Sequence, residues 1–297
     1  MELLHPQTAI YRMKRPRPLL AALDDTKACL HDRTTNPASK KRSGSMKMLR
    51  SLCVPALAIL LAACGSSPKK AEQSSPLAAA GQVVLVTSPG WDAPTGTLRT
   101  FERTEAGWRE VGQARNVTLG RAGSGWGIGL HEPQVVGPRK QEGDGRSPAG
   151  IFLVGEAFGY PEKVDTGLEY HAMDAGDWCV DVSGSLYYNR IINVAKVGEH
   201  AIEGSSEPMR RDLHADGDQR YRIGFVVEHN PSGADRGGSC IFAHVWKSPD
   251  DSTAGCTAMS DANMQDLLRW LDRRRNPMFV LLPEDAYAEL RAAWMLP

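Results

Sequence analysis

The sequence lacks the charge excess that a nucleic-acid-binding protein needs. Its 35 Lys and Arg residues balance its 35 Asp and Glu residues. Basic residues outnumber acidic ones 11 to 4 in residues 1–64, whereas acidic residues outnumber basic ones 31 to 24 in residues 65–297. Binding to nucleic acid requires a basic face that displaces counterions. We therefore expect no nucleic-acid partner.

The chain also lacks an apolar run of the length that a membrane-spanning helix requires, roughly 20 residues. The run at residues 52–63 is shorter, follows a basic start at residues 46–50, and ends in Leu61-Ala62-Ala63-Cys64. This arrangement is typical of a bacterial lipoprotein signal. We expect a signal peptide at residues 46–64 with lipid attached to Cys64, which would hold the protein in the periplasm through this membrane anchor alone.

Three further segments follow from composition. Residues 1–45 carry scattered Arg, Lys and Pro with no apolar period, so we expect them to be unstructured. A translation start at Met46 or Met48 would make them an error of start assignment. Residues 65–81 are small and polar, which predicts a flexible tether, and residues 82–297 are long enough for a sizeable core.

Metal-ligand spacing is missing as well. Within residues 82–297, the histidines outside the motif described below have no spacing that indicates a metal site; they are His131, His171, His200, His214 and His229. We expect neither a metal nor another cofactor.

What the folded part does contain is a series of short β-strand patterns between turn residues. They lie at residues 83–87, 97–103, 108–112, 152–154, 176–181, 190–194, 224–228 and 278–282. This series predicts a mainly β fold, a mixed β-sandwich with one or two peripheral helices. One helix should begin after Ser260, bury Met264, Leu267 and Leu268, and end at Asn276-Pro277; a second should span residues 285–294.

An imidazole and a thiol lie close together near the end of the chain. Residues 240–246 alternate like a strand that would project His244 from one face, and residues 248–252 would turn the chain back toward Cys256. A nucleophilic cysteine needs a nearby base, and Gly255 would let a substrate approach the backbone. Taken alone, such a pair is more often a buried cysteine and an unrelated histidine.

The surroundings of this pair resemble the L,D-transpeptidase (YkuD-like) catalytic domain. Two segments carry the resemblance, which extends over residues 83–282: His244 followed by Thr253-Ala254-Gly255-Cys256, and Ser147-Pro148-Ala149-Gly150-Ile151-Phe152. It implies Cys256 as nucleophile, His244 as base, and peptidoglycan stem peptides as substrates in cell wall biogenesis. We expect the backbone N–H groups of Gly255 and Cys256 to stabilise the oxyanion.

Three positions depart from the family's pattern. Val245 replaces a residue that often orients the histidine, Ala254 replaces a second histidine, and Ala258 stands where a polar side chain often contacts substrate. A transpeptidase, which passes the acyl group to an amine, is the preferred interpretation. A hydrolase on the same scaffold and a non-catalytic wall-binding lipoprotein remain alternatives.

Two other cysteines belong to the predicted folded part. Cys240 lies four residues from His244, roughly 13 Å along a strand, which is too far for it to be the activated thiol. Cys179 and Cys240 would form a disulfide in an exported protein or remain two buried thiols.

Overall fold

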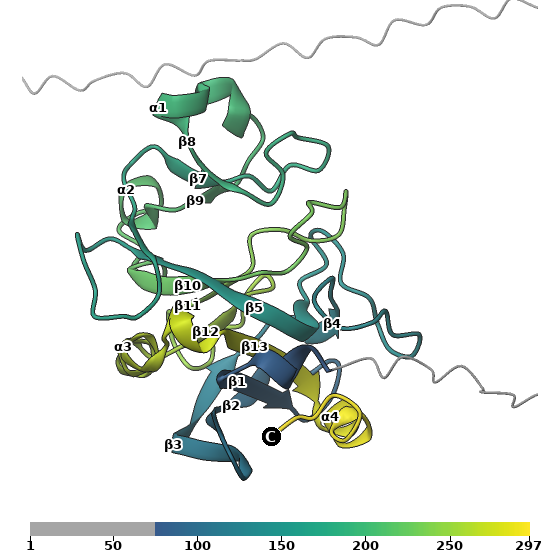
Figure 1. The fold of residues 1–297 in the computed structure, drawn as a ribbon. Coiled ribbons are helices and arrows are strands. Elements are labelled where there is room, and N and C mark those ends of the chain that lie inside the picture. The colour runs from purple at the N-terminus through teal and green to yellow at the C-terminus, as the bar shows by residue number, and fades with distance from the viewer. Residues whose placement is uncertain (1–74) are drawn as a thin grey trace, which may run out of the picture. The chain divides into compact units, whose positions relative to one another are not determined.

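The computed structural model describes residues 75–297 (Figure 1). The predicted unstructured start, the signal peptide, Cys64 and most of the predicted tether lie outside the described residues. Within residues 75–297, no helix has the length and apolar character needed to cross a membrane.

A mixed sheet of ten strands dominates this part of the chain. Its strands are β1 (Gln82–Ser88), β2 (Thr95–Thr104), β3 (Gly107–Thr118), β4 (Ser124–Trp126), β5 (Ser147–Gly159), β6 (Tyr170–Ala172), β10 (Ile223–Val227), β11 (Phe242–Val245), β12 (Thr257–Met259) and β13 (Pro277–Pro283). β10 pairs with both β11 and β5, so the sheet closes on itself, with β4 and β6 as additional partners of β5. The predicted mainly β fold is confirmed, and one continuous sheet surrounds the core.

The core forms where the sequence is most apolar. Val83, Val84 and Val86 of β1 are completely buried, and every residue of β13 is buried beside them. β1 and β13 pair in parallel, so the chain's first and last strands lie side by side. The strands predicted at residues 97–103 and 108–112 form a hairpin, because β2 and β3 pair in antiparallel fashion up to Thr104 and Gly107.

The predicted helix is α3 (Asp261–Trp270), which begins after Ser260 because the Ser260 side chain accepts a hydrogen bond from Asn263 N–H. It ends at Trp270, earlier than the predicted end at Asn276-Pro277. The chain instead becomes extended at Leu271, whose carbonyl accepts a hydrogen bond from Gly167 N–H. This long-range contact has no local signal. α4 (Glu284–Leu290) likewise ends before the predicted position 294.

Part of the predicted tether packs on the core. The 3-10 helix η1 (Pro76–Ala79) buries Leu77, whose carbonyl accepts a hydrogen bond from Arg103 Nη2 at 2.7 Å. The Ser75 hydroxyl donates to the Trp294 carbonyl. The packed part therefore begins before Gln82, where the sequence analysis placed the boundary.

A second, smaller sheet lies between β6 and β10 in the sequence. It contains β7 (Asp177–Cys179), β8 (Ile191–Asn193) and β9 (Glu207–Pro208), accompanied by the single-turn helices α1 (Val194–Val197) and α2 (Arg211–His214). We call residues 173–218 the insertion. In Figure 1 it lies at the top, on the opposite side of β5 and β10 from the β2–β3 hairpin. The sequence analysis did not predict these two single-turn helices, because each is too short to show an apolar period.

Candidate active site

The two catalytic candidates lie on β11 and immediately before the neighbouring strand β12. β11 and β12 pair in parallel, with His244 opposite Ala258 and Ala243 opposite Thr257. Cys256 immediately precedes β12, and its Sγ accepts a hydrogen bond from Phe242 N–H at 3.3 Å. Both side chains line one cavity of about 450 Å³. Within residues 75–297 no hydrogen bond joins them directly, although catalytic contacts often tighten only when substrate binds.

Backbone geometry fixes the role of each His244 nitrogen. Nδ1 lies 2.8 Å from the Val245 carbonyl oxygen, which can only accept a hydrogen bond. The neutral ring therefore carries its proton on Nδ1 and leaves Nε2 as the basic nitrogen. Burial, followed by the charges of Arg220 and Arg211, lowers the pKa of His244 to about 4. The Val245 carbonyl orients the imidazole, so the side chain at position 245 is not needed for this purpose.

Cys256 is protonated at rest. Burial raises the pKa of its thiol to about 12, and the Glu207 carboxylate acts in the same direction, whereas Phe242 N–H lowers it. The N-terminus of α3 does not favour the thiolate, because β12 separates Cys256 from that helix by roughly 10 Å at strand rise, beyond the first helical turn where the dipole acts. The resting pair is thus a thiol and a neutral imidazole.

The two sequence motifs meet at the backbone of Cys256. Its carbonyl accepts hydrogen bonds from the Ser147 hydroxyl at 3.1 Å and the Thr253 hydroxyl at 2.6 Å. Gly255 N–H donates to Thr253 Oγ1 at 3.1 Å, so this expected oxyanion donor is already engaged. A Cβ at Gly255 would lie 3.0 Å from the Arg146 carbonyl oxygen, which explains why glycine fits here. Ser147 and Thr253 hold the backbone of Cys256 in place, a role that spacing alone did not reveal.

Gly150 of the first motif has a separate structural reason. Its φ is +136°, and a Cβ at this position would lie 1.9 Å from Cε1 of His131. His131 Nδ1 accepts a hydrogen bond from Ile151 N–H at 3.1 Å. The glycine therefore makes room for a histidine that anchors the beginning of β5 near Ser147.

Comparison with known proteins agrees with this geometry. The family model of the YkuD L,D-transpeptidase catalytic domain matches residues 108–280, more than half of the chain. The chain belongs to this family. No curated protein and no solved structure matches it. The matched range includes β11, β12 and the insertion of the YkuD domain.

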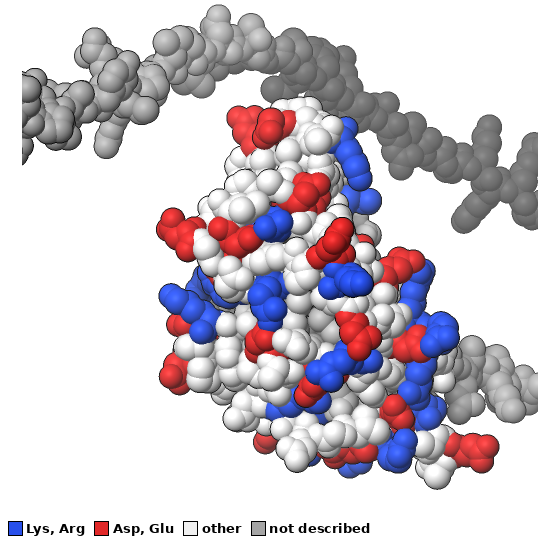
Figure 2. Space-filling view, turned by 90° about the vertical axis from the view of Figure 1, so that its left-hand side faces the viewer, with Lys and Arg blue, Asp and Glu red and all other residues white. Residues whose placement is uncertain are grey.

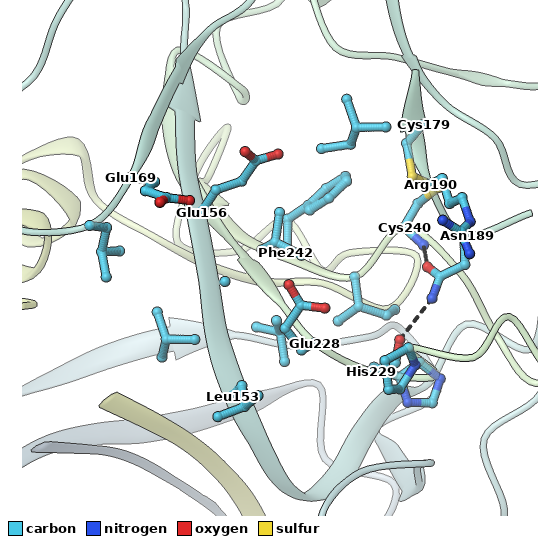
Figure 3. Close-up of a pocket in the computed structure, with 18 of the residues that line it drawn as sticks. Leu153, Glu156, Glu169, Cys179, Asn189, Arg190, Glu228, His229, Cys240 and Phe242 are labelled. Atoms are coloured by element: carbon cyan, nitrogen blue, oxygen red, sulfur yellow. Dashed lines mark hydrogen bonds between the residues drawn. A yellow bond between two sulfur atoms is a disulfide. The ribbon is translucent and has the colours of Figure 1, made fainter. Parts of the chain in front are cut away.

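A disulfide connects the insertion to the segment that precedes β11. Cys179 of β7 is joined to Cys240, and the Cys240 carbonyl lies 3.5 Å from Sγ of Cys256, whose thiol donates to it. Cys240 has a φ of +54°, so the strand begins at Phe242 and not at Cys240 as expected. Asn189 Oδ1 accepts a hydrogen bond from Cys240 N–H, and its Nδ2 donates to the His229 carbonyl (Figure 3).

The insertion and the segment after it supply polar side chains that the sequence analysis missed. Glu207, Arg211, Arg220 and Tyr221 all line the cavity that contains Cys256. Asp218 accepts hydrogen bonds from both Arg211 and Arg220, which keeps the two guanidinium groups together at the wall of the cavity. Residues 199–222 show no regular apolar period, so the sequence gave no reason to place them there.

A larger cavity of about 970 Å³ has both cysteines of the disulfide in its wall (Figure 3). Polar residues that the sequence analysis left out of the site contribute to its wall, namely Asn189, Arg190 and Glu228. Burial, followed by the charge of Glu156, raises the pKa of Glu228. Neither His244 nor Cys256 lines this cavity, so the smaller one is the candidate active site of the YkuD domain. No group of His, Cys, Asp and Glu in residues 75–297 is arranged to hold a metal.

Proposed function

We propose that this protein is a peptidoglycan L,D-transpeptidase that uses Cys256 as its nucleophile. Membership of the YkuD family supports an enzyme that acts on peptidoglycan stem peptides. The observation that carries the proposal is the cavity shared by the buried Cys256 thiol, immediately before β12, and the His244 imidazole of β11, whose Nδ1 proton is held by the Val245 carbonyl. A non-catalytic wall-binding protein would have no need of this arrangement.

The reaction starts from the neutral pair. His244 Nε2 takes the proton of the Cys256 thiol as sulfur attacks the carbonyl carbon between the third and fourth residues of a stem peptide. The Cys256 N–H stabilises the resulting oxyanion, a contribution of about 3 kcal/mol for one such donor. The imidazolium then gives its proton to the leaving amine, so the fourth residue departs as D-alanine and a thioester remains on Cys256.

Transfer completes the cycle. The amine of a second stem peptide attacks the thioester carbonyl, His244 Nε2 takes a proton from that amine, and the Cys256 sulfur leaves and recovers its proton. A new amide bond joins the two stem peptides. A hydrolase would use the same steps with water in place of the amine.

Incubation of the purified protein with disaccharide-tetrapeptides tests this proposal, with products analysed by mass spectrometry. We expect cross-linked dimers that have lost one D-alanine, and we expect Cys256→Ala to yield none. Glu105→Gln in the exposed β2–β3 turn is the matched control and should leave the products unchanged. Shortened monomers alone would replace the transpeptidase with the hydrolase. Full activity of Cys256→Ala would refute both.

A further inference from the structure

Tyr221 lines the cavity that contains Cys256. Its side chain is buried, and its ring makes edge-to-face contacts with His244 at 5.1 Å and Phe242 at 5.4 Å between ring centroids. Tyr221 and Cys256 pack in the same cluster of buried side chains, and Glu207 lines the same cavity. The cavity thus holds one hydroxyl donor and two groups, the Cys256 sulfur and the Glu207 carboxylate, that can accept a hydrogen bond from it.

Glu207 is held in the wall of the same cavity by an ion pair. It lies on β9 of the insertion, and its Oε1 accepts a hydrogen bond from Arg211 Nη1 at 2.9 Å. Only 22% of its side chain is exposed. Arg211 is in turn held by Asp218 at 2.9 Å. A negative charge is thus held next to a thiol that must ionise during the reaction.

We propose that Tyr221 and Glu207 form a positioning pair that controls the ionisation of Cys256. The Tyr221 hydroxyl has one proton and donates to one acceptor at a time. When it donates to the sulfur it stabilises the thiolate, and the Glu207 carboxylate opposes the thiolate by its charge and by competing for the same proton. The inference rests on the proposed function only in taking Cys256 as the nucleophile.

The other charged groups around the pair are compatible with this role. Burial, followed by the Glu207 and Cys256 charges, raises the pKa of Tyr221 well above its usual value, so the hydroxyl keeps its proton at neutral pH. Lys140 acts against Glu207 by favouring the thiolate, and its Nζ is bound to Asp144 at 2.6 Å. Burial raises the pKa of Glu207, the Arg211 guanidinium lowers it, and the Asp181 carboxylate raises it. His244 contacts the Tyr221 ring and has its own hydrogen bond to Val245.

Opposite signs are expected for two conservative substitutions. Tyr221→Phe removes the donor to the thiolate and should raise the pKa of Cys256. Glu207→Gln removes the negative charge while keeping a side chain of the same size, and should lower that pKa. A loosened cavity would admit water in both variants and so would lower the pKa in both, because burial is what raises it most.

The rate at which iodoacetamide alkylates Cys256 reports the pKa of its thiol, because the thiolate is the reactive form. At a fixed pH below the pKa, the alkylation rate follows the fraction of thiolate. The reaction is run at pH 8 and followed by mass analysis of the Cys256 peptide. We expect Tyr221→Phe to react at least threefold more slowly than the unchanged protein. Glu207→Gln should react at least threefold faster. Between pH 7 and pH 9 the logarithm of each rate should run parallel to that of the unchanged protein.

Two matched controls come from the same chain. Tyr170→Phe removes a hydroxyl that donates to the Pro161 carbonyl away from this cavity, and Glu203→Gln changes an exposed carboxylate of the insertion. Both should alkylate at the unchanged rate. No substrate is present, so the result stands whether or not the protein proves to be a transpeptidase. Opposite shifts in the two test variants support the proposal; any other combination overturns it.

Discussion

Three histidines of residues 75–297 are buried, namely His131, His229 and His244. Each has a ring nitrogen in a hydrogen bond with the backbone. His229 Nδ1 accepts from Ile128 N–H, and its Nε2 lies 2.9 Å from the Gly237 carbonyl oxygen, which requires a proton on Nε2. Burial lowers the pKa of both His229 and His244 to about 4, and it lowers that of His131 as well. These side chains fold as neutral rings.

The buried, neutral histidines lead to a prediction about stability in acid. Between pH 6.5 and about pH 4 the unfolded chain binds protons at these histidines and the folded chain does not, so the free energy of unfolding falls as the pH is lowered through this window. A shift of His229 from 6.5 to about 4 corresponds to about 3 kcal/mol. We expect His229→Gln to be less stable at pH 7 and to have a shallower pH dependence, measured by urea unfolding.

The exposed His200 provides the control, because His200→Gln should reproduce the pH dependence of the unchanged protein. Carboxylates titrate in all three proteins and do not affect the comparison. Equal slopes for His229→Gln and the unchanged protein would contradict a neutral, buried His229.

The sequence predicted those strands and helices whose own residues carry a clear apolar pattern or cap. The apolar run of β1, the alternating β2–β3 hairpin and the capped, amphipathic α3 all lie where their patterns placed them. The predicted ends of helices and strands are wrong where contacts with distant segments determine the backbone conformation. α3 ends at Trp270 because Gly167 binds the Leu271 carbonyl, and β11 starts at Phe242 because Cys240 turns aside in a left-handed conformation. Neither contact can be read from neighbouring residues.

The element η1 offers a test of where the folded domain begins. Leu77 is completely buried among core residues, although its composition had placed it in a flexible tether. We expect Leu77→Ala to lower the free energy of unfolding by about 3 kcal/mol, the usual cost of truncating a buried leucine. Leu186→Ala is the matched control, since that side chain is 94% exposed and its truncation should change stability by less than about 0.5 kcal/mol. Urea unfolding of both variants tests whether the folded domain includes Leu77. If Leu77 belonged to a flexible tether, its truncation would change stability as little as that of Leu186.

For the molecule as a whole, the sequence indicated the proposed catalytic pair but not the residues around it. His244 and Cys256 could be proposed because strand, turn and motif lie within a short stretch. Tyr221, Glu207 and Arg211 reach the same cavity through the closure of β10 onto β11 and through the insertion, which a disulfide ties to Cys240. On the face shown in Figure 2, basic and acidic side chains are interspersed, with no large area of one sign. The charge that matters for the proposed chemistry lies inside the cavity.

The last prediction concerns where the catalytic domain works. We propose that the protein is processed as a lipoprotein and held at a periplasmic membrane through Cys64, because Leu61-Ala62-Ala63-Cys64 follows a short apolar run. Cys64→Ala should accumulate as an unprocessed precursor, seen as a larger band on immunoblots and as a missing mature N-terminal peptide in mass spectrometry. Cys53→Ala is the matched control: it changes a cysteine within the apolar run and should be processed normally. A mature N-terminus at any residue other than Cys64 would show that the anchor was wrongly assigned, while leaving the proposed chemistry of Cys256 untouched.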